Sequence, residues 1–259
     1  MMAHIATDPM HQFKIVRLFD LNIGGVDVSF TNSSLFMVIG VLGIIVFFAW
    51  ALSRPKTVPD RKQSLAEIWY GFVAGIVRDV NHEDGKPFVP LVFTIFSFIF
   101  VANVLGMFSV PGANTFTSTS HIVVTGTMAV FTFLLVVAIG IWKNGFKFLK
   151  VFVPSGVPWY ILWFVVIIEV FSFLSRPLSL GMRLFANMLG GHVALKVFAG
   201  FIPQLVIGLG LVGVGMAAFL VMPLVIGVTA LELLVAFLQA YVFAILTCVY
   251  LNDSLHPGH

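Results

Sequence analysis

The stretch VFAGFIPQLVIGLGLVGVGMAAFLVMPLVIGVTAL, residues 197–231, contains no charged side chain. A membrane helix needs about 20 consecutive apolar residues, so this run is long enough for more than one crossing. It forms the middle of a longer apolar region, residues 157–251, and several glycines and Pro203 interrupt it. We therefore expect two long helices, residues 157–200 and 212–251, joined by a Gly-rich turn. Each would exceed the thickness of the bilayer core and lie strongly tilted.

The composition of the whole chain agrees with a membrane protein. Of 259 residues, 59% are hydrophobic and 10% are charged, and the mean hydropathy is +1.06. An ordinary soluble domain has about 25% charged residues and could not bury so much apolar surface. The net charge of +3 does not predict a nucleic-acid partner, because the basic residues lie in short loops. The single cysteine, Cys248, excludes an internal disulfide and a multi-cysteine metal site.

Three further uncharged runs predict three more spans, at residues 35–52, 88–108 and 122–142. The expected fold is thus an all-α integral membrane protein with about five membrane helices. Residues 1–34 form an N-terminal arm, and residues 35–259 form a single membrane domain.

The distribution of Lys and Arg predicts the orientation. These residues are frequent in segments 53–87 and 143–156 and absent from loop 109–121. The positive-inside rule therefore puts the first two segments on the cytoplasmic (or matrix) side, with the N-terminus outside and the C-terminus inside. Lys14 and Arg17 in the arm do not fit this pattern.

Residues 64–82 predict an amphipathic helix rather than a span. Apolar residues from Leu65 to Val80 recur at the spacing of one helical face, and Ser64 with Glu67 forms a capping-box pattern at the start. We expect this helix to lie along the membrane surface. The alternative is a helix that faces water and packs on a loop.

Polar side chains are set into the apolar C-terminal region. An ionised group at the centre of a membrane helix costs roughly 2.5–3.5 kcal/mol on insertion scales, so such residues usually have a function. Lys196 and Gln204 fit residues at helix ends, and Arg176 fits an end residue or a packing pair. Arg183 fits neither, because apolar residues dominate on both sides of it. The complete set is Glu169, Arg176, Arg183, Asn187, His192, Lys196, Gln204, Glu232 and Gln239.

The spacing of these residues arranges them on two faces and in two pairs. Glu169, Arg176 and Arg183 are seven residues apart, so each lies about 20° from the last on one stripe, which Asn187 extends. His192 lies nine residues beyond Arg183, on the opposite face and about 13.5 Å further along. In an antiparallel hairpin, Arg183 with Gln239 and His192 with Glu232 centre on nearly the same point, residues 211–212.

The expected depths of these groups in the membrane place them along a possible path for protons. Glu169 lies near the inner face, Arg183 about 21 Å deeper, and His192 and Glu232 beyond it toward the outside. Carboxylates and imidazoles can pass protons near neutral pH, whereas arginine stays charged. Titratable groups on both sides of a permanent cation predict two half-channels separated by an electrostatic block.

The sequence SRPLSLGMRLFANMLGGH, residues 175–192, closely resembles the signature of subunit a of the rotary F-type ATP synthase. Residues 231–243, LELLVAFLQAYVF, are similar to the last helix of that family, and residues 102–107, ANVLGM, are similar to the end of its second full span. A histidine after the motif and a glutamate in the last helix resemble the alphaproteobacterial and mitochondrial branch.

The resemblance implies a non-catalytic, proton-conducting stator subunit beside a rotating ring of c subunits. It implies that protons pass His192 and Glu232 on the outer side and Glu169 on the inner side, with Arg183 between them. Asn187 and Gln239 would orient water and Arg183, and Asn103 would line the outer path. Ser179 would touch the inner path or serve packing.

The same resemblance implies further partners and a location. The surface helix would contact the peripheral stalk subunit b, lipid would surround the spans, and no cofactor or metal is expected. The location would be the bacterial inner membrane, with the mitochondrial inner membrane as the alternative. The coupling ion would be a proton, with sodium as the alternative, because selectivity would lie largely in the ring. Two features limit how far the family's properties can be transferred to this chain. They are a long Gly-rich turn and a 109–121 loop whose single titratable group is His121.

Other classes of protein fit the sequence less well. A secondary transporter predicts an inverted repeat with broken helices, but the polar residues collect in the C-terminal part alone. A membrane enzyme would need a metal constellation, a phosphate loop or a nucleophile motif, and the sequence has none. Arg183 disfavours a simple open cation pore.

Overall fold

The computed structural model describes residues 17–20, 22–23, 26–27, 29–107, 118–153 and 157–256. Within these ranges the all-α membrane fold is confirmed. The N-terminal arm adds four short strands that the sequence did not predict: β1 (Arg17–Phe19) pairs antiparallel with β4 (Phe30–Thr31), and β2 (Asn22–Ile23) with β3 (Val26–Asp27). Four helical stretches of the described chain are long and apolar enough to cross a membrane: Asn32–Ala51, Arg61–Met107, Ile122–Phe152 and Trp159–Leu255.

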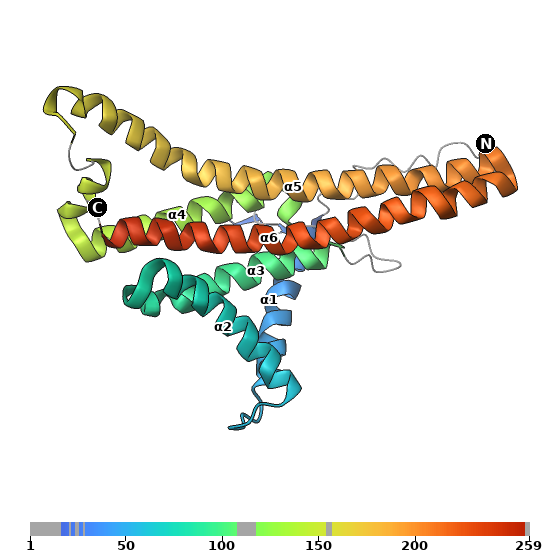
Figure 1. Cartoon of the computed structure of the whole chain (residues 1–259), viewed down its shortest axis with the longest axis horizontal. Coiled ribbons are helices and arrows are strands. Elements are labelled where there is room, and N and C mark those ends of the chain that lie inside the picture. Colours follow the sequence, from blue (N-terminus) through green and yellow to red (C-terminus); the bar gives the residue numbers. More distant parts are fainter. Residues whose placement is uncertain are drawn as a thin grey trace.

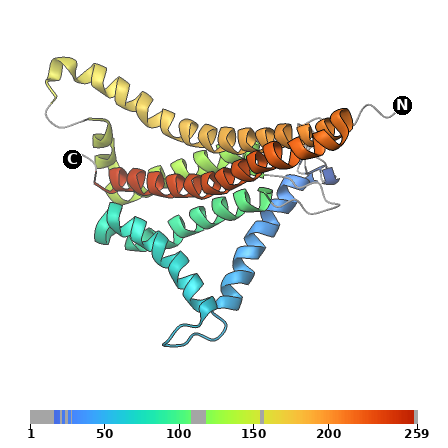
Figure 2. The same ribbon diagram turned by 45° about the vertical axis from the view of Figure 1, so that its right-hand side comes forward.

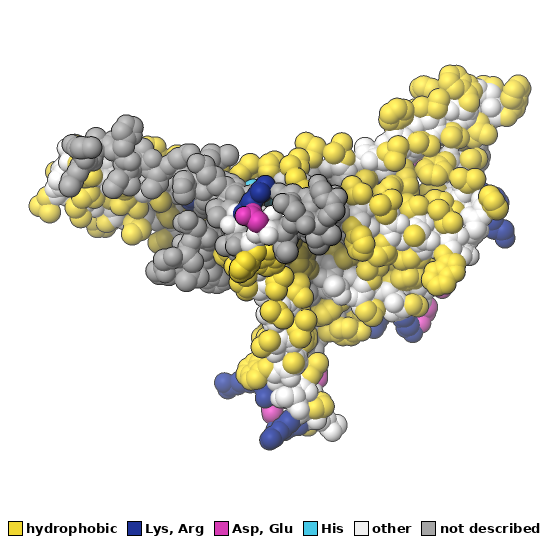
Figure 3. All heavy atoms as spheres, turned by 180° about the vertical axis from the view of Figure 1, so that it is seen from behind, with side chains coloured by type: hydrophobic (Ala, Val, Ile, Leu, Met, Phe, Trp, Pro, Cys, Tyr) yellow, Lys and Arg dark blue, Asp and Glu magenta, His cyan; other side chains and the backbone are white. Residues whose placement is uncertain are grey.

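Helix α1 (Asn32–Ala51) and helix α2 (Arg61–Asn81) form a V that projects from the rest of the molecule (Figures 1 and 2). The Thr31 side chain caps α1 by accepting a hydrogen bond from the Ser34 backbone N–H. Lys and Arg side chains gather at the tip of the V, where α1 is joined to α2, and hydrophobic side chains cover most of the remaining visible face (Figure 3).

The predicted start of α2 is wrong. The helix begins at Arg61, three residues before Ser64, and Asp60 is its N-cap. The capping box does not form, because Ser64 already lies in the first turn, where its backbone N–H donates to the Asp60 carbonyl. The Glu67 carboxylate instead accepts a hydrogen bond of 2.7 Å from Gln63. The preceding Pro59 favours an extended conformation before the helix, which sets the earlier start.

Two further long helices, α3 and α4, lie at the centre of the molecule. The 3₁₀ segment η2 (His82–Phe88) leads into α3 (Val89–Met107), and η3 (Ser118–Ser120) leads into α4 (Ile122–Asn144), which η4 (Gly145–Phe152) follows. Helix α3 packs along α6, and the two share a buried core with α2, α4 and α5. The fully buried side chains of this shared core include Val73, Val92, Ile99, Leu184, Met188, Ala236, Ala240, Phe243 and Cys248.

The C-terminal region folds back on itself as a hairpin, and the chain reverses near Gly210, within α5 (Trp159–Met216). The end of α5, the π-helical segment η5 (Ala217–Val221) and α6 (Met222–Leu255) form the returning arm. The two arms run side by side in both ribbon views (Figures 1 and 2). Both arms are longer than the roughly 20 residues that cross a bilayer upright, so in a membrane they must tilt or project.

The first arm is longer than the sequence predicted. It does not end near residue 200 but continues through Gly200 and Pro203 as far as Gly210, whose φ of 55° and ψ of −127° interrupt the helix. A Cβ on Gly213 would overlap the carbonyl oxygen of Leu205, so glycine is needed where the chain doubles back. A helical glycine costs only about 1 kcal/mol relative to alanine, which explains why the earlier glycines do not end the helix.

Candidate functional site

The hairpin brings His192 and Glu232 into contact, as the antiparallel numbering predicted. His192 Nδ1 lies 2.9 Å from Glu232 Oε1, and the two side chains are 8% and 1% exposed. Neither carboxylate oxygen of Glu232 makes a hydrogen bond of ordinary geometry with any described residue. A buried carboxylate without such partners can bind water, because an unsatisfied buried polar group is costly.

Gly191 makes room for this pair. A Cβ at this position would lie 2.9 Å from Glu232 Oε1 and 3.2 Å from its Cδ, closer than side chains normally approach. The neighbouring Gly190 has nothing within 4 Å of its Cβ position. The sequence alone did not predict this spatial role.

Asn103 lies on α3 beside the same part of α6. Its Nδ2 donates a hydrogen bond of 3.2 Å to the carbonyl oxygen of Ala236, one helical turn beyond Glu232. The residue is completely buried, and its Oδ1 has no hydrogen-bond partner among the described residues. Asn103, as expected for a candidate site residue, is thus a third buried polar group with a free acceptor near the His192–Glu232 pair.

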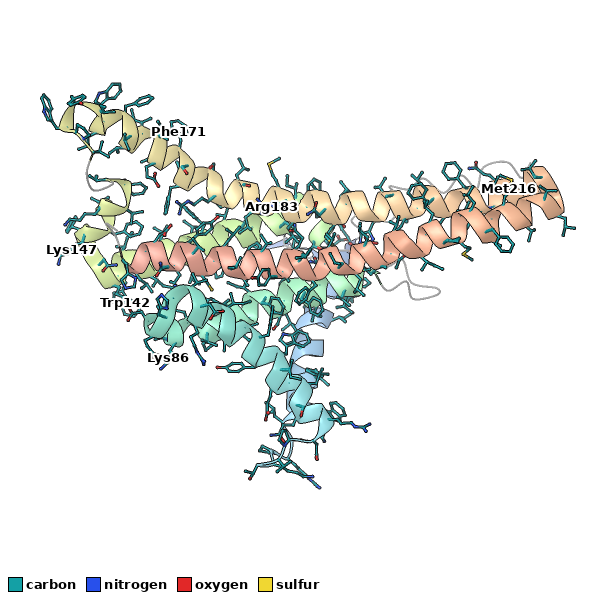
Figure 4. The ribbon with its side chains drawn as sticks, in the orientation of Figure 1. Lys86, Trp142, Lys147, Phe171, Arg183 and Met216 are labelled. Atoms are coloured by element: carbon teal, nitrogen blue, oxygen red, sulfur yellow. The ribbon has the colours of Figure 1, made fainter. Side chains whose placement is uncertain are left out.

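Arg183 and Asn187 lie on the exposed face of α5, while Leu184 and Met188 on the other face are buried. Figure 4 shows Arg183 on α5 between the labelled Phe171, in the first part of the arm, and Met216 at the hairpin tip. In the described part of the chain no ion pair joins Arg183 to a carboxylate. Arg183 lies on a helix face with exposed apolar side chains, including Leu178 (64% exposed) and Met182 (50% exposed).

Arg183 and Gln239, the second pair expected from the antiparallel numbering, differ in burial. Gln239 is 7% exposed, whereas Arg183 is exposed. The His192–Glu232 pair centres on residue 212, and the pair between Arg176 and Asp253 centres between residues 214 and 215.

Glu169 lies at the open end of the hairpin, next to Arg176. Glu169 Oε1 is 3.7 Å from Arg176 Nη2, and Arg176 Nη1 donates a hydrogen bond of 2.9 Å to Asp253 Oδ2 on α6. Arg176 thus pairs with carboxylates on both arms of the hairpin. This is one of the two roles expected for it. Asp253 was missed because it lies at the end of the last apolar run, where a charged residue needs no special explanation.

A second set of buried polar residues lies where η3 meets the other helices. Ser118, Thr119 and Ser120 are each at most 3% exposed, and Ser118 Oγ donates a 3.3 Å hydrogen bond to the carbonyl oxygen of Ser33. Partial burial lowers the pKa of the adjacent His121, which favours the neutral imidazole. Most of the loop expected to form the outer mouth, residues 108–117, lies outside the described residues.

Among the described residues, no group of three or more His, Cys, Asp or Glu side chains is arranged to hold a metal ion. The one cysteine, Cys248, is buried and forms no disulfide. Carboxylate and imidazole side chains are groups that can exchange protons, whereas arginine is a fixed cation.

Comparison with known proteins agrees with this chemistry. The family described as ATP synthase A chain matches residues 34–252. ATP synthase subunit a of Chelativorans sp. (strain BNC1) is 56% identical over 257 residues, covering 98% of this chain and 100% of the relative. ATP synthase subunit a of Maricaulis maris (strain MCS10) is 54% identical over 256 residues, covering 98% and 99%. This chain belongs to the ATP synthase A chain family.

Proposed function

We propose that this chain is the stator subunit that conducts protons through two half-channels to the carboxylates of a rotating c ring, with Arg183 between the half-channels. The observation that carries this proposal is the placement of Arg183. It is an exposed cation on an apolar helix face, with a buried acid–base pair toward the hairpin tip and a partly exposed carboxylate toward the open end.

The exposed position of Arg183 supports a charged partner outside this chain. An arginine that faced lipid at mid-membrane would cost at least several kcal/mol, and it stays protonated at any physiological pH. A carboxylate on a neighbouring ring helix would compensate this charge. Arg183 would attract the ionised ring carboxylate, promote proton release and prevent protons from passing directly between the half-channels.

His192, Glu232 and Asn103 would form the inner part of the outer half-channel. The Glu232 carboxylate lacks well-formed hydrogen bonds, and Asn103 Oδ1 is a free buried acceptor. Water molecules that satisfied these atoms would form a chain along which protons move. A proton arriving here would neutralise a ring carboxylate, which could then enter the lipid.

The inner half-channel would pass Glu169, whose side chain is 29% exposed. Asn187, on the same exposed face as Arg183, would orient water and the guanidinium. Gln239 faces the core of this chain, so its contribution would be made from the buried side of α6.

The remaining assignments follow from the charge pattern and the family. Helix α2 would lie along the inner membrane surface and contact the peripheral stalk subunit b. The N-terminus would lie outside and the C-terminus inside the bacterial inner membrane, with the mitochondrial inner membrane as the alternative. The exposed apolar side chains of Leu65 (53%) and Ile68 (68%) on α2 support contact with lipid or with another subunit.

The proposal is tested by Glu232→Gln in the assembled complex, with ATP-driven proton pumping measured in inverted membrane vesicles. We expect pumping to fall at least about tenfold with assembly retained, because the amide cannot exchange a proton. Glu83→Gln, which removes an exposed carboxylate from η2, is the control and should pump normally. Normal pumping by Glu232→Gln would remove this residue from the proton path.

A further inference from the structure

One guanidinium joins the two arms of the hairpin at their open end. Arg176 on α5 contacts Asp253 on α6 at 2.9 Å and Glu169, two turns back on α5, at 3.7 Å. It also lies over the rings of Phe173 (5.4 Å) and Tyr250 (5.2 Å). Arg176 is therefore held from several directions and reaches the carboxylate proposed to lie in the inner half-channel.

The two carboxylates do not share this cation equally. Asp253 makes a direct hydrogen bond to Nη1, whereas Glu169 stands 3.7 Å from Nη2, beyond hydrogen-bond distance. Contacts with two aromatic rings further restrict the position of the guanidinium. Asp253 thus anchors the cation, and Glu169 is its second, more loosely held partner.

The surroundings of the cluster leave this carboxylate accessible to water. The side chains of Arg176, Glu169 and Asp253 are 22%, 29% and 37% exposed. On α6, Tyr250 borders the cluster, with its ring 5.2 Å from the guanidinium carbon of Arg176. From α4 and η4 the neighbours are uncharged rings that pack on Phe173, namely Phe133, Phe148 and Phe152.

We propose that Arg176 is a positioning residue of the inner half-channel: anchored by Asp253, it holds Glu169 and sets the pH range over which Glu169 exchanges protons with the inner compartment. This inference rests on the proposed function, since it takes Glu169 to lie on the proton path. It assigns a role to the Arg176–Asp253 pair across the hairpin, beyond holding the two arms together.

The test uses the pH dependence of ATP-driven pumping in inverted vesicles, where the external buffer bathes the inner half-channel. Pumping takes protons from that buffer, so it declines at high pH when Glu169 can no longer be protonated. Arg176→Gln removes the cation that favours ionised Glu169, and the decline should move to higher pH. Asp253→Asn removes an anion and leaves the cation to Glu169, so the decline should move to lower pH. Each shift should be about half to one pH unit, since the cluster is partly exposed.

The opposite signs separate positioning from a purely mechanical clamp. A clamp would be broken by either substitution, and both variants would then lose pumping at every pH without opposite shifts. Arg176→Lys keeps the charge and should retain a profile close to that of the unmodified chain. Lys150→Gln, which removes an exposed cation from η4, is the control for net charge and should leave the profile unchanged. If Arg176→Gln fails to assemble, Asp253→Asn and Arg176→Lys still decide between the two.

Glu169→Gln separates the role proposed for Arg176 from the proposed function on which that role rests. Pumping by this variant should fall about tenfold. If it pumps normally, Glu169 is not on the path, and both the inner half-channel as proposed and the role of Arg176 are wrong. If it is impaired but Arg176→Gln and Asp253→Asn shift the profile in the same direction or not at all, only the positioning role is overturned.

Discussion

Two regions of the hairpin hold ionisable side chains in opposite environments. Toward the tip, His192 and Glu232 are nearly inaccessible, and the carboxylate lacks well-formed hydrogen bonds. At the open end, Glu169 shares Arg176 with Asp253, and all three side chains are partly exposed.

The two regions differ in how strongly a charge is felt. Little water screens the buried pair, so a charge on either side chain acts strongly on the other. In the open cluster, a permanent cation compensates the carboxylate and water screens the remainder. The buried pair is therefore expected to be sensitive to small structural changes, and the open cluster to tolerate them.

The largest expected effect comes from the buried pair itself. Either His192→Glu or Glu232→His alone puts two like groups in contact, and we expect each to reduce ATP-driven pumping by at least about tenfold. The double variant restores one imidazole and one carboxylate and should pump better than either single variant. A double variant whose loss is the product of the two single losses would show that the 2.9 Å contact has no functional meaning.

A smaller but sharper effect is expected at Gly191. In Gly191→Ala the new Cβ would press on the Glu232 carboxylate, and we expect pumping to fall several-fold with the complex assembled. Gly190→Ala is the matched control, because its Cβ would meet no atom within 4 Å. Equal pumping rates for the two variants would mean that Glu232 moves aside freely and that its position is not critical.

Two buried asparagines allow function and stability to be separated. Asn103 donates to the Ala236 carbonyl and Asn81 donates to the Cys248 carbonyl, at 3.2 and 3.0 Å, and both are at most 1% exposed. Alanine at either position should destabilise the protein by about 1–3 kcal/mol, observed as a lower thermal stability of the purified complex. Pumping per assembled complex should fall only for Asn103→Ala, since Asn81, on α2, contacts α6 at Cys248, about three turns beyond Ala236. Equal pumping by both variants would assign Asn103 a structural role alone.

The smallest effect is expected at the surface pair between His256 and Asp84, which joins the end of α6 to η2. The two atoms are 3.0 Å apart, but the side chains are 39% and 56% exposed. Such a pair contributes about 0–1 kcal/mol, so Asp84→Asn should leave pumping and thermal stability nearly unchanged. A clear loss of pumping would indicate that the inner surface of η2 takes part in the mechanism.

Much of this architecture could be predicted from the sequence because the bilayer imposes a simple rule. Uncharged runs of sufficient length become helices, and α3 and α4 begin within one residue of the predicted spans 88–108 and 122–142. The contact between His192 and Glu232 followed from counting residues along an antiparallel hairpin. These features depend on length, polarity and helix periodicity, which a single sequence contains.

Other features depend on packing and could not be read from the sequence. The first arm passes Gly200 and Pro203 because neighbouring helical residues outweigh their low propensity. The ion pair between Arg176 and Asp253 depends on how the two arms pack, which residue counting does not give. Likewise, only the three-dimensional structure reveals that Gly191 rather than Gly190 borders Glu232.

The central claim is that Arg183 separates two half-channels, and Arg183→Ala tests it most directly. ATP-driven pumping and passive proton leak should be measured in membrane vesicles containing the assembled complex, with Arg78→Ala as a control that removes an exposed arginine from α2. We predict that Arg183→Ala abolishes pumping and increases the leak, while Arg78→Ala does neither. Normal pumping without leak in Arg183→Ala would contradict the account and reduce this arginine to a structural charge.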